Sequence, residues 1–468
     1  MSKIQAAPAR ANPATERQAV TARAHGPLLD MIHGLRLADL PEAVVAQAER
    51  CLLDLAGVAA SGTRTDLSRI IRDHAVRHFG AGEGPGARIL FDGRRASAPG
   101  AALAGGMTID SMDAHDGHRL TKGHVGVAVL PALLAYADAG AAPDGREILT
   151  SLVLGYEIGT RAGIALHGTV ADYHTSGAWN ALACAALGAR LLKLDRERTR
   201  HALGIAEYHG PRSQMMRCID HPTMLKDGSG WGAMGGVSAA YLAADGFTGA
   251  PAISIEAPEA ASYWSDLGRR WCIMEQYFKP YPVCRWAQPA VEAALSVVRR
   301  HRLDPAAIAR IEVVTFHEAV RLAVRRPADT EQAQYALPYP VAAALARGRL
   351  GPEEVTGAAL RDPAILRLAD AVTLSEGDAY NARFPAERWA HVSVATADGR
   401  TFASEPTTAR GDPDAPLARE EIAAKFHAIA APVVGEGRAR AIEQAVHALR
   451  DAGTAEVARL VDLLTKAA

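Results

Sequence analysis

Small residues recur at helical spacing through the first half of the chain, and this pattern restricts the fold more than any other feature. The stretch 145–166 carries Gly155, Gly159 and Gly163 at four-residue intervals. Because each glycine lowers helix propensity, this spacing predicts a helix with another backbone packed close to that face. Small or apolar residues repeat similarly in four further stretches, 40–60, 126–139, 178–192 and 229–244. We find no convincing strand pattern between 40 and about 270, which favours a large helical body.

The pattern changes after residue 272. Residues 310–317 are β-branched and aromatic in partial alternation, which is typical of a strand. Residues 388–405 predict two strands joined at Asp398-Gly399, a hairpin signal. Helices are predicted between these strands, at LPYPVAAALARG and EEVTGAALRDPAILRLADAV. A proline-rich connector follows, and the chain is then helical to its end.

We therefore expect a mostly α protein with an inserted α+β part. The large all-helical domain comprises residues 25–272 together with 405–468, and the smaller α+β domain comprises 273–404. Residues 1–24 are rich in Ala and Arg with one acid, a composition shared by disordered N-termini and mitochondrial presequences. We expect residues 1–24 to be disordered.

Composition excludes several classes of partner. Lys and Arg number 51 against 52 Asp and Glu, so we expect no binding to nucleic acid or to an anionic membrane surface. No apolar run approaches the roughly 18–20 residues that a membrane-spanning helix needs. The five cysteines are scattered without a C-x-x-C pair, which argues against a disulfide framework and a thiolate zinc site. These features predict a cytoplasmic protein.

One polar loop, residues 111–126, interrupts two apolar helical stretches. It concentrates six side chains that bind protons or metals: Asp113, His115, Asp116, His118, Lys122 and His124. A metal site and a solvated loop are alternatives, but no H-x-x-x-H or H-E-x-x-H motif is present. We favour a catalytic acid/base loop without a metal, because histidine titrates near neutrality and carboxylates can orient it.

Three other segments carry candidate residues. His174 precedes a predicted helix start, and Lys226 stands just before a glycine-rich one, where anions are welcome. Lys279 and Arg285 flank a proline-rich turn and suit carboxylate binding. Only seven of the 51 basic residues are lysines, and three of those, Lys122, Lys226 and Lys279, lie in these segments. Acid/base groups beside several cations are what proton abstraction next to a carboxylate requires, because the resulting enediolate is anionic.

Six segments together resemble the MmgE/PrpD family, in order, over roughly residues 30–450. They are LLDLAGVAASG, GYEIGTRAG, KDGSGWGAM with the following GVSAA and LAADGFTG, FKPYPVCRWAQPAVEAAL, YALPYPVAAAL and RGDPDAPL. The family includes 2-methylcitrate dehydratase, cis-aconitate decarboxylase and iminodisuccinate epimerase. The resemblance implies a helical domain built from both chain ends, an α+β lid domain between them, no metal or organic cofactor, and a homodimer.

The resemblance also implies roles for single residues. His124 matches the histidine near the reacting carbon and His174 the second histidine. The acidic loop matches at Asp113 and Asp116, and the two family lysines match at Lys226 and Lys279.

Three positions depart from the family pattern: Ala114, Gly117 and Val125. At Gly117 a hydroxyl that contacts substrate in the family is absent. We expect His115 and His118 to add substrate contacts in its place.

These observations predict a cofactor-free lyase that acts on a small anionic di- or tricarboxylate. Dehydration of the 2-methylcitrate type is the first expectation, with His124, Asp113, Asp116 and His174 catalytic. Decarboxylation of the cis-aconitate type and epimerisation of the iminodisuccinate type are alternatives. A metal-dependent hydrolase and an inactive helical scaffold are the rivals from other classes.

Overall fold

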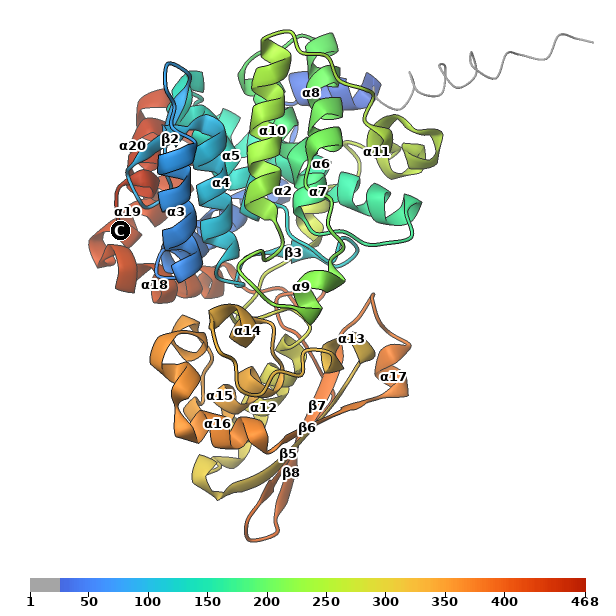
Figure 1. Cartoon of the computed structure of the whole chain (residues 1–468), viewed down its shortest axis with the longest axis vertical. Helices are drawn as coiled ribbons and strands as arrows, with labels where there is room; N and C mark the ends of the chain where they lie inside the picture. The colour runs from blue at the N-terminus through green and yellow to red at the C-terminus, as the bar shows by residue number, and fades with distance from the viewer. Residues whose placement is uncertain (1–25) are drawn as a thin grey trace, which may run out of the picture.

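The computed structural model describes residues 26–468 and is mostly α-helical (Figure 1). The predicted fold class, mostly α, is therefore confirmed. The disorder predicted for residues 1–24 falls outside the described residues. Within residues 26–468, no helix has both the length and the hydropathy needed to cross a membrane.

The predicted helices of the first half form the upper bundle in Figure 1. Its main members are α2 (Glu42–Gly62), α4 (Ala98–Asp110), α5 (Gly126–Tyr136), α6 (Gly145–Thr169), α7 (Gly177–Leu191) and α10 (Ser229–Ala244). In α10 the small residues do allow close backbone approach, because a Cβ at Gly236 would lie 2.3 Å from the Ala181 carbonyl oxygen of α7. In α6 the neighbours are instead side chains: Gly155 faces Val129, and Gly163 faces Trp179. The close backbone predicted beside α6 is therefore wrong.

The last helices of the chain return to this bundle. They are α18 (Arg419–Val434), α19 (Glu436–His447) and α20 (Thr454–Thr465), drawn in red beside the blue N-terminal helices in Figure 1. α18 packs along α2, where Gly57 makes room for Phe426. The first and last parts of the chain thus share one hydrophobic core.

A five-stranded sheet lies in the lower part of Figure 1. Its strands are β5 (Ile308–Thr315), β6 (Val372–Glu376), β7 (Trp389–Thr396), β8 (Thr401–Ala403) and β9 (Thr407–Thr408). β5 pairs in parallel with β6 and antiparallel with β7, and β7 also pairs with β8 and β9. Alternate residues of β7 are buried, and α12 (Gln288–His301) packs against this strand.

The predicted hairpin at Asp398-Gly399 is confirmed as the turn between β7 and β8. The strand predicted at 310–317 begins and ends two residues earlier, as β5. The domain limits at 272 and 404, and movement of this region as a lid, stay predictions.

Short strands are the main correction to the sequence analysis. The helical half contains a hairpin of β1 (Gly86–Arg88) and β2 (Arg95–Ser97), and β3 (Gly117–His118) pairs with β4 (Gln276–Tyr277). Strands this short show no alternation that a sequence pattern could reveal. The pairing of β3 with β4 holds the polar loop 111–126 against the segment that carries Lys279.

The predicted helix at 353–372 is also interrupted. It consists of two 3₁₀ turns and α16 (Pro363–Asp370), and β6 follows directly. The sequence analysis missed this strand. β6 pairs in parallel with β5, and both α15 (Pro338–Arg347) and α16 separate the two strands in the chain, so the pairing leaves no local turn signal.

Candidate active site

The polar loop between α4 and α5 is buried. His115 and Asp116 are fully enclosed, and Asp113 is 2% exposed. Buried titratable groups are costly unless they are paired or hydrogen-bonded. The contacts of these side chains therefore decide what the loop can do.

Asp113 forms an ion pair with Lys279. The Lys279 Nζ lies 2.6 Å from Asp113 Oδ1, and Lys279 is 1% exposed. Burial alone would raise the pKa of the Asp113 carboxyl, but the ammonium groups of Lys279 and Lys226 hold it well below its usual value. The Asp113 main-chain N–H donates to Gln334 Oε1 at 2.6 Å, and Lys226 Nζ donates to the same oxygen at 3.2 Å. Asp113 is therefore a fixed carboxylate.

His124 is fixed by three hydrogen bonds. Its N–H donates to Ser176 Oγ at 2.9 Å, and its carbonyl accepts from Asn180 Nδ2 at 2.9 Å. The ring Nδ1 is hydrogen-bonded to the carbonyl oxygen of Asp116. A carbonyl can only accept, so Nδ1 carries the hydrogen and Nε2 is the unprotonated nitrogen. Burial lowers the pKa of His124 well below its usual value, and Lys279 and His115 lower it further.

Asp116 lies behind His124. Tyr156 donates its hydroxyl to Asp116 Oδ2, and burial raises the pKa of this carboxyl to about 7. The nearby charge of Asp54 on α2 adds to the increase. Asp116 thus holds His124 through its main chain, while its side chain changes protonation state near physiological pH.

Lys425, on α18, contacts the polar loop, and the sequence analysis missed this residue. Its Nζ lies 2.6 Å from Asp54 Oδ1 and donates to the carbonyl oxygen of Ala114 at 2.6 Å. The scarcity of lysine was the available signal, because Lys425 is one of only seven lysines. It positions the loop from the opposite end of the chain.

The other predicted binding residues, Lys226 and Arg285, already contact groups of the protein. Lys226 lies over the ring of Tyr335 at 4.6 Å. Arg285 Nη2 lies 2.7 Å from Asp412 Oδ1, and Arg285 Nη1 donates to the Arg410 carbonyl at 2.9 Å. Of the Arg285 nitrogens, Nε has no hydrogen-bond partner among the described residues. Substrate binding by Lys226 and Arg285 stays a prediction.

The remaining predicted histidines are His115, His118 and His174, and none of them lines the cavity around His124. His115 packs edge-on against the His124 ring at 4.3 Å, and its Nε2 lies 3.6 Å from Asp110 Oδ1. His118 Nε2 lies 3.0 Å from Glu275 Oε2. His174 stands three residues before α7 and is half-buried.

The cavity around His124 has a volume of about 20 Å³, which is room for roughly one water molecule. Side chains from both halves of the chain enclose it: Asp113, Lys122, His124, Met215, Ile219, Tyr277, Lys279, Cys284, Arg285, Trp286, Tyr335 and Arg388. Tyr277, Tyr335 and Arg388 were missed by sequence reasoning. Arg388 precedes β7 and is brought to the cavity by tertiary packing alone.

Three buried side chains of the polar loop also have the spacing of a metal site. Ligand atoms of Asp113, His115 and His124 all lie within 4.8 Å of one another. However, Asp113 Oδ1 already accepts a hydrogen bond from the Lys279 ammonium, and the positive charge of Lys279 opposes a cation beside it. The donor set therefore fits a metal poorly, and a reaction without a metal stays a prediction.

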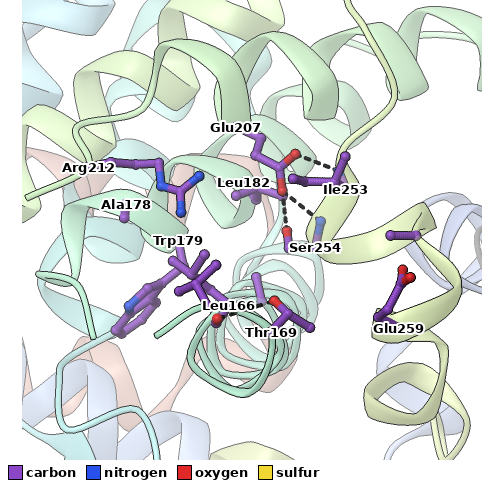
Figure 2. Close-up of a pocket in the computed structure, with 13 residues that line it drawn as sticks. Leu166, Thr169, Ala178, Trp179, Leu182, Glu207, Arg212, Ile253, Ser254 and Glu259 are labelled. Atoms are coloured by element: carbon purple, nitrogen blue, oxygen red, sulfur yellow. Dashed lines mark hydrogen bonds between the residues drawn. The ribbon is translucent and has the colours of Figure 1, made fainter. Parts of the chain in front are cut away.

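A second cavity, of about 200 Å³, lies between α6, α7 and the short helix α11 (Ile253–Glu256) (Figure 2). Its floor is apolar, with Trp179 and Leu182. Glu207 accepts hydrogen bonds from the N–H groups of Ile253 and Ser254, as the dashed lines in Figure 2 show. Its charged groups are thus hydrogen-bonded or exposed.

Two family models match the chain. Residues 27–264 match the MmgE/PrpD N-terminal domain, and residues 281–451 match the MmgE/PrpD C-terminal domain. The chain belongs to the MmgE/PrpD family. This confirms the resemblance found in the sequence.

Curated relatives of this MmgE/PrpD protein match nearly its full length. Human (Homo sapiens) cis-aconitate decarboxylase is 25% identical over 90% of each chain. The mouse (Mus musculus) cis-aconitate decarboxylase is 25% identical over 90% of this chain and 89% of its own. The cis-aconitate decarboxylase-like protein oryM of Aspergillus oryzae is 24% identical over 94% of this chain and 96% of its own.

The departure from the MmgE/PrpD pattern at Gly117 has a physical cause. A Cβ at this position would lie 2.5 Å from Tyr277 Oη and 2.6 Å from His124 Nδ1. Any larger residue would therefore displace His124 or the β3–β4 pair. Gly117 lets the His124 ring reach the Asp116 carbonyl.

Proposed function

We propose that this protein is a lyase that forms a carbanion next to a carboxylate of a small di- or tricarboxylate. The observation that carries the proposal is the neutral imidazole of His124 in one cavity with the Asp113–Lys279 ion pair. A neutral imidazole can move a proton to or from carbon. A fixed ammonium stabilises the enediolate charge that results.

Dehydration is the first candidate, because the tautomer of His124 supports proton abstraction. With the hydrogen on Nδ1, Nε2 is free to accept the α-proton. The electron pair of the broken C–H bond then forms the double bond as the β-hydroxyl leaves. The departing hydroxide takes up the proton from the imidazolium, so that water and neutral imidazole result. A substrate of the 2-methylcitrate type has this leaving group.

Decarboxylation is the second candidate, because the curated relatives are named for it. Here the C–C bond to a carboxylate breaks, CO2 leaves, and an imidazolium returns a proton to the carbanion. Burial and Lys279 disfavour the imidazolium in the free protein. A bound tricarboxylate brings the negative charge that raises the pKa of His124 again. Epimerisation shares the carbanion and differs in the face to which the proton returns.

The deciding experiment is NMR in D2O with 2-methylcitrate, citrate, cis-aconitate and iminodisuccinate. Deuterium at an α-carbon reveals the carbanion even without net turnover. A new alkene from a citrate identifies dehydration, and loss of CO2 from cis-aconitate identifies decarboxylation. The proposed function would be refuted if none of the four acids showed either exchange or turnover.

A chelation test checks the metal-free part of the proposal. The incomplete donor set around Asp113 leads us to expect unchanged turnover after EDTA treatment and desalting. Loss of activity that one divalent ion restores would show that the 113–124 loop binds a metal.

A further inference from the structure

Arg388 is a buried cation without a counter-ion of its own. It is 3% exposed, and its Nε and Nη1 have no hydrogen-bond partner among residues 26–468. Its one hydrogen bond is a long one, from Nη2 to the Arg119 carbonyl at 3.5 Å. The unpaired face of a buried guanidinium in a cavity wall is a ready donor for a carboxylate.

Lys122 is a second such cation on the same cavity. It is half-buried, and its Nζ lies 4.4 Å from the centre of the Tyr173 ring. In the described part of the chain it has no hydrogen bond or ion pair to a carboxylate. Its backbone has φ 49°, a left-handed conformation that costs energy for a residue with a side chain. The loop thus accepts backbone strain while directing an ammonium to this cavity.

Neighbouring charges do not neutralise this pair. Two carboxylates attract this pair without forming an ion pair with it: Glu318 acts on Lys122, and Asp412 acts on Arg388. Asp412 is shared by Arg285 at 2.7 Å and Arg119 at 3.3 Å. Arg388 and Lys122 repel each other, and Arg285 and Arg119 repel Arg388 as well. The cavity therefore has an excess of positive charge, because Asp113, the one carboxylate among the described residues of its lining, is already paired with Lys279. An unpaired buried cation costs stability, so it is retained where a ligand supplies the anion.

We propose that Arg388 and Lys122 form a second anion subsite, which binds a carboxylate of the substrate remote from the reacting carbon. This inference rests on the proposed function and deepens it, because it requires a substrate with at least two separated carboxylates. Such a substrate also requires the cavity of about 20 Å³ to widen on binding. Lys122 comes from the loop between α4 and α5, and Arg388 comes from the start of β7. One remote carboxylate therefore connects the helical bundle to the sheet region.

The test is calorimetric titration of the full-length protein with tricarballylate. This tricarboxylate has no double bond and no β-hydroxyl, so it cannot undergo decarboxylation or dehydration. The variants are Arg388→Gln, Lys122→Met and the charge-preserving Arg388→Lys. Arg383→Gln is the matched control, because Arg383 lies five residues away, 51% exposed and paired with Glu387.

We expect Arg388→Gln and Lys122→Met each to weaken tricarballylate binding by about 10- to 150-fold, the range for loss of a charge-assisted hydrogen bond. Arg388→Lys should recover at least half of the loss on a logarithmic scale, and the control should stay within twofold. The melting temperature of ligand-free Arg388→Gln should be unchanged or higher, because a buried unpaired charge is removed. A purely structural arginine would give a lower melting temperature.

Two results would overturn the subsite. One is affinity within threefold of wild type in both Arg388→Gln and Lys122→Met. The other is that both variants bind more weakly and both also have a lower melting temperature, so that the loss of binding follows from a loss of stability. If the wild-type protein fails to bind tricarballylate but exchanges or converts one of the four acids in D2O, the subsite fails and the proposed function stands. If the four acids give neither exchange nor turnover, the proposed function fails. The titration and the NMR assay together thus separate the two failures.

Discussion

Two cavities of this protein differ about tenfold in volume, and the smaller one contains the more reactive groups. The cavity at His124 has about 20 Å³ and encloses unpaired cations, a neutral imidazole and a fixed carboxylate. The cavity in Figure 2 has about 200 Å³ and an apolar floor, and its Glu207 is satisfied by main-chain N–H groups. The smaller cavity holds groups that the fold leaves unsatisfied.

The difference shows that volume alone does not identify an active site. A buried charge without a partner lowers stability, and so does a buried carboxyl whose pKa is raised towards 7 once it ionises. The persistence of such a group in the fold indicates a function. Imperfect packing alone explains a cavity whose polar groups are hydrogen-bonded and whose floor is apolar. Four predictions test this distinction.

The largest expected effect is on His124. Loss of a general base costs about 10² to 10⁴ in rate, so His124→Gln should lose that much turnover and stop α-proton exchange in D2O. Its circular dichroism and melting temperature should remain close to wild type. His115→Gln and His118→Gln should keep exchange. Exchange near the wild-type rate in His124→Gln would place the base elsewhere.

The lysines should come next. Lys279→Ala removes the ammonium that lies 2.6 Å from Asp113 Oδ1. Lys226→Ala removes the ammonium that lies over the ring of Tyr335. We expect each to lower kcat/KM by about 10- to 150-fold, the value of a charge-assisted hydrogen bond. Lys193→Ala is the control, because Lys193 lies outside the loop and its cavity. Losses below threefold at both site lysines would show that neither stabilises charge during the reaction.

Asp116 and Asp113 should affect stability in opposite directions. Burial raises the pKa of Asp116 to about 7, so its ionisation destabilises the fold increasingly between about pH 4 and pH 7. Asp116→Asn should raise the free energy of unfolding by about 1–4 kcal/mol at pH 8 and by less at pH 5.

The pKa of Asp113 is lowered, so its stabilisation is present above the unfolded value and is lost as the pH falls towards the folded one. Asp113→Asn should therefore lower the melting temperature at pH 8. Urea unfolding of both variants at the two pH values checks the signs. A decrease in stability for Asp116→Asn at pH 8 would contradict the raised pKa.

The smallest effect is expected in the cavity of Figure 2. Glu259→Gln and Arg212→Gln change exposed charges at its wall, and kcat/KM should stay within twofold of wild type. A tenfold loss in either variant would mean that the larger cavity also serves the reaction and would remove the contrast drawn above.

Local patterns predicted most of the fold. The helical spacing at 229–244 corresponds to α10 at the same residues, and the Asp398-Gly399 turn joins β7 to β8. Each of these signals lies within one short segment of the chain. β3 could not be predicted, because a strand of this length shows no alternation and its partner β4 comes only after α10 in the sequence.

The site was predictable only in part for the same reason. The loop 113–124 is recognisable because it concentrates acids and histidines in one short segment. The chain has 51 basic residues, of which seven are lysines and 44 are arginines. The residues that neighbour Arg388 in the sequence do not distinguish it from the other arginines. Gln334, which accepts hydrogen bonds from both Asp113 and Lys226, is likewise one of several polar residues in the short helix α14 (Thr330–Gln334). Only the tertiary structure brings such residues to the cavity.

The contact between Lys425 and the Ala114 carbonyl also has a consequence for biosynthesis. The two residues are 311 positions apart in the chain. At a synthesis rate of about 5–20 residues per second, the ribosome makes Ala114 roughly 15 to 60 s before Lys425. During that interval Asp54 has no ammonium beside it, and the loop lacks its anchor on α18. The active site can therefore mature only after α18 has been synthesised, and a nascent chain that stops before α18 leaves this loop without its anchor.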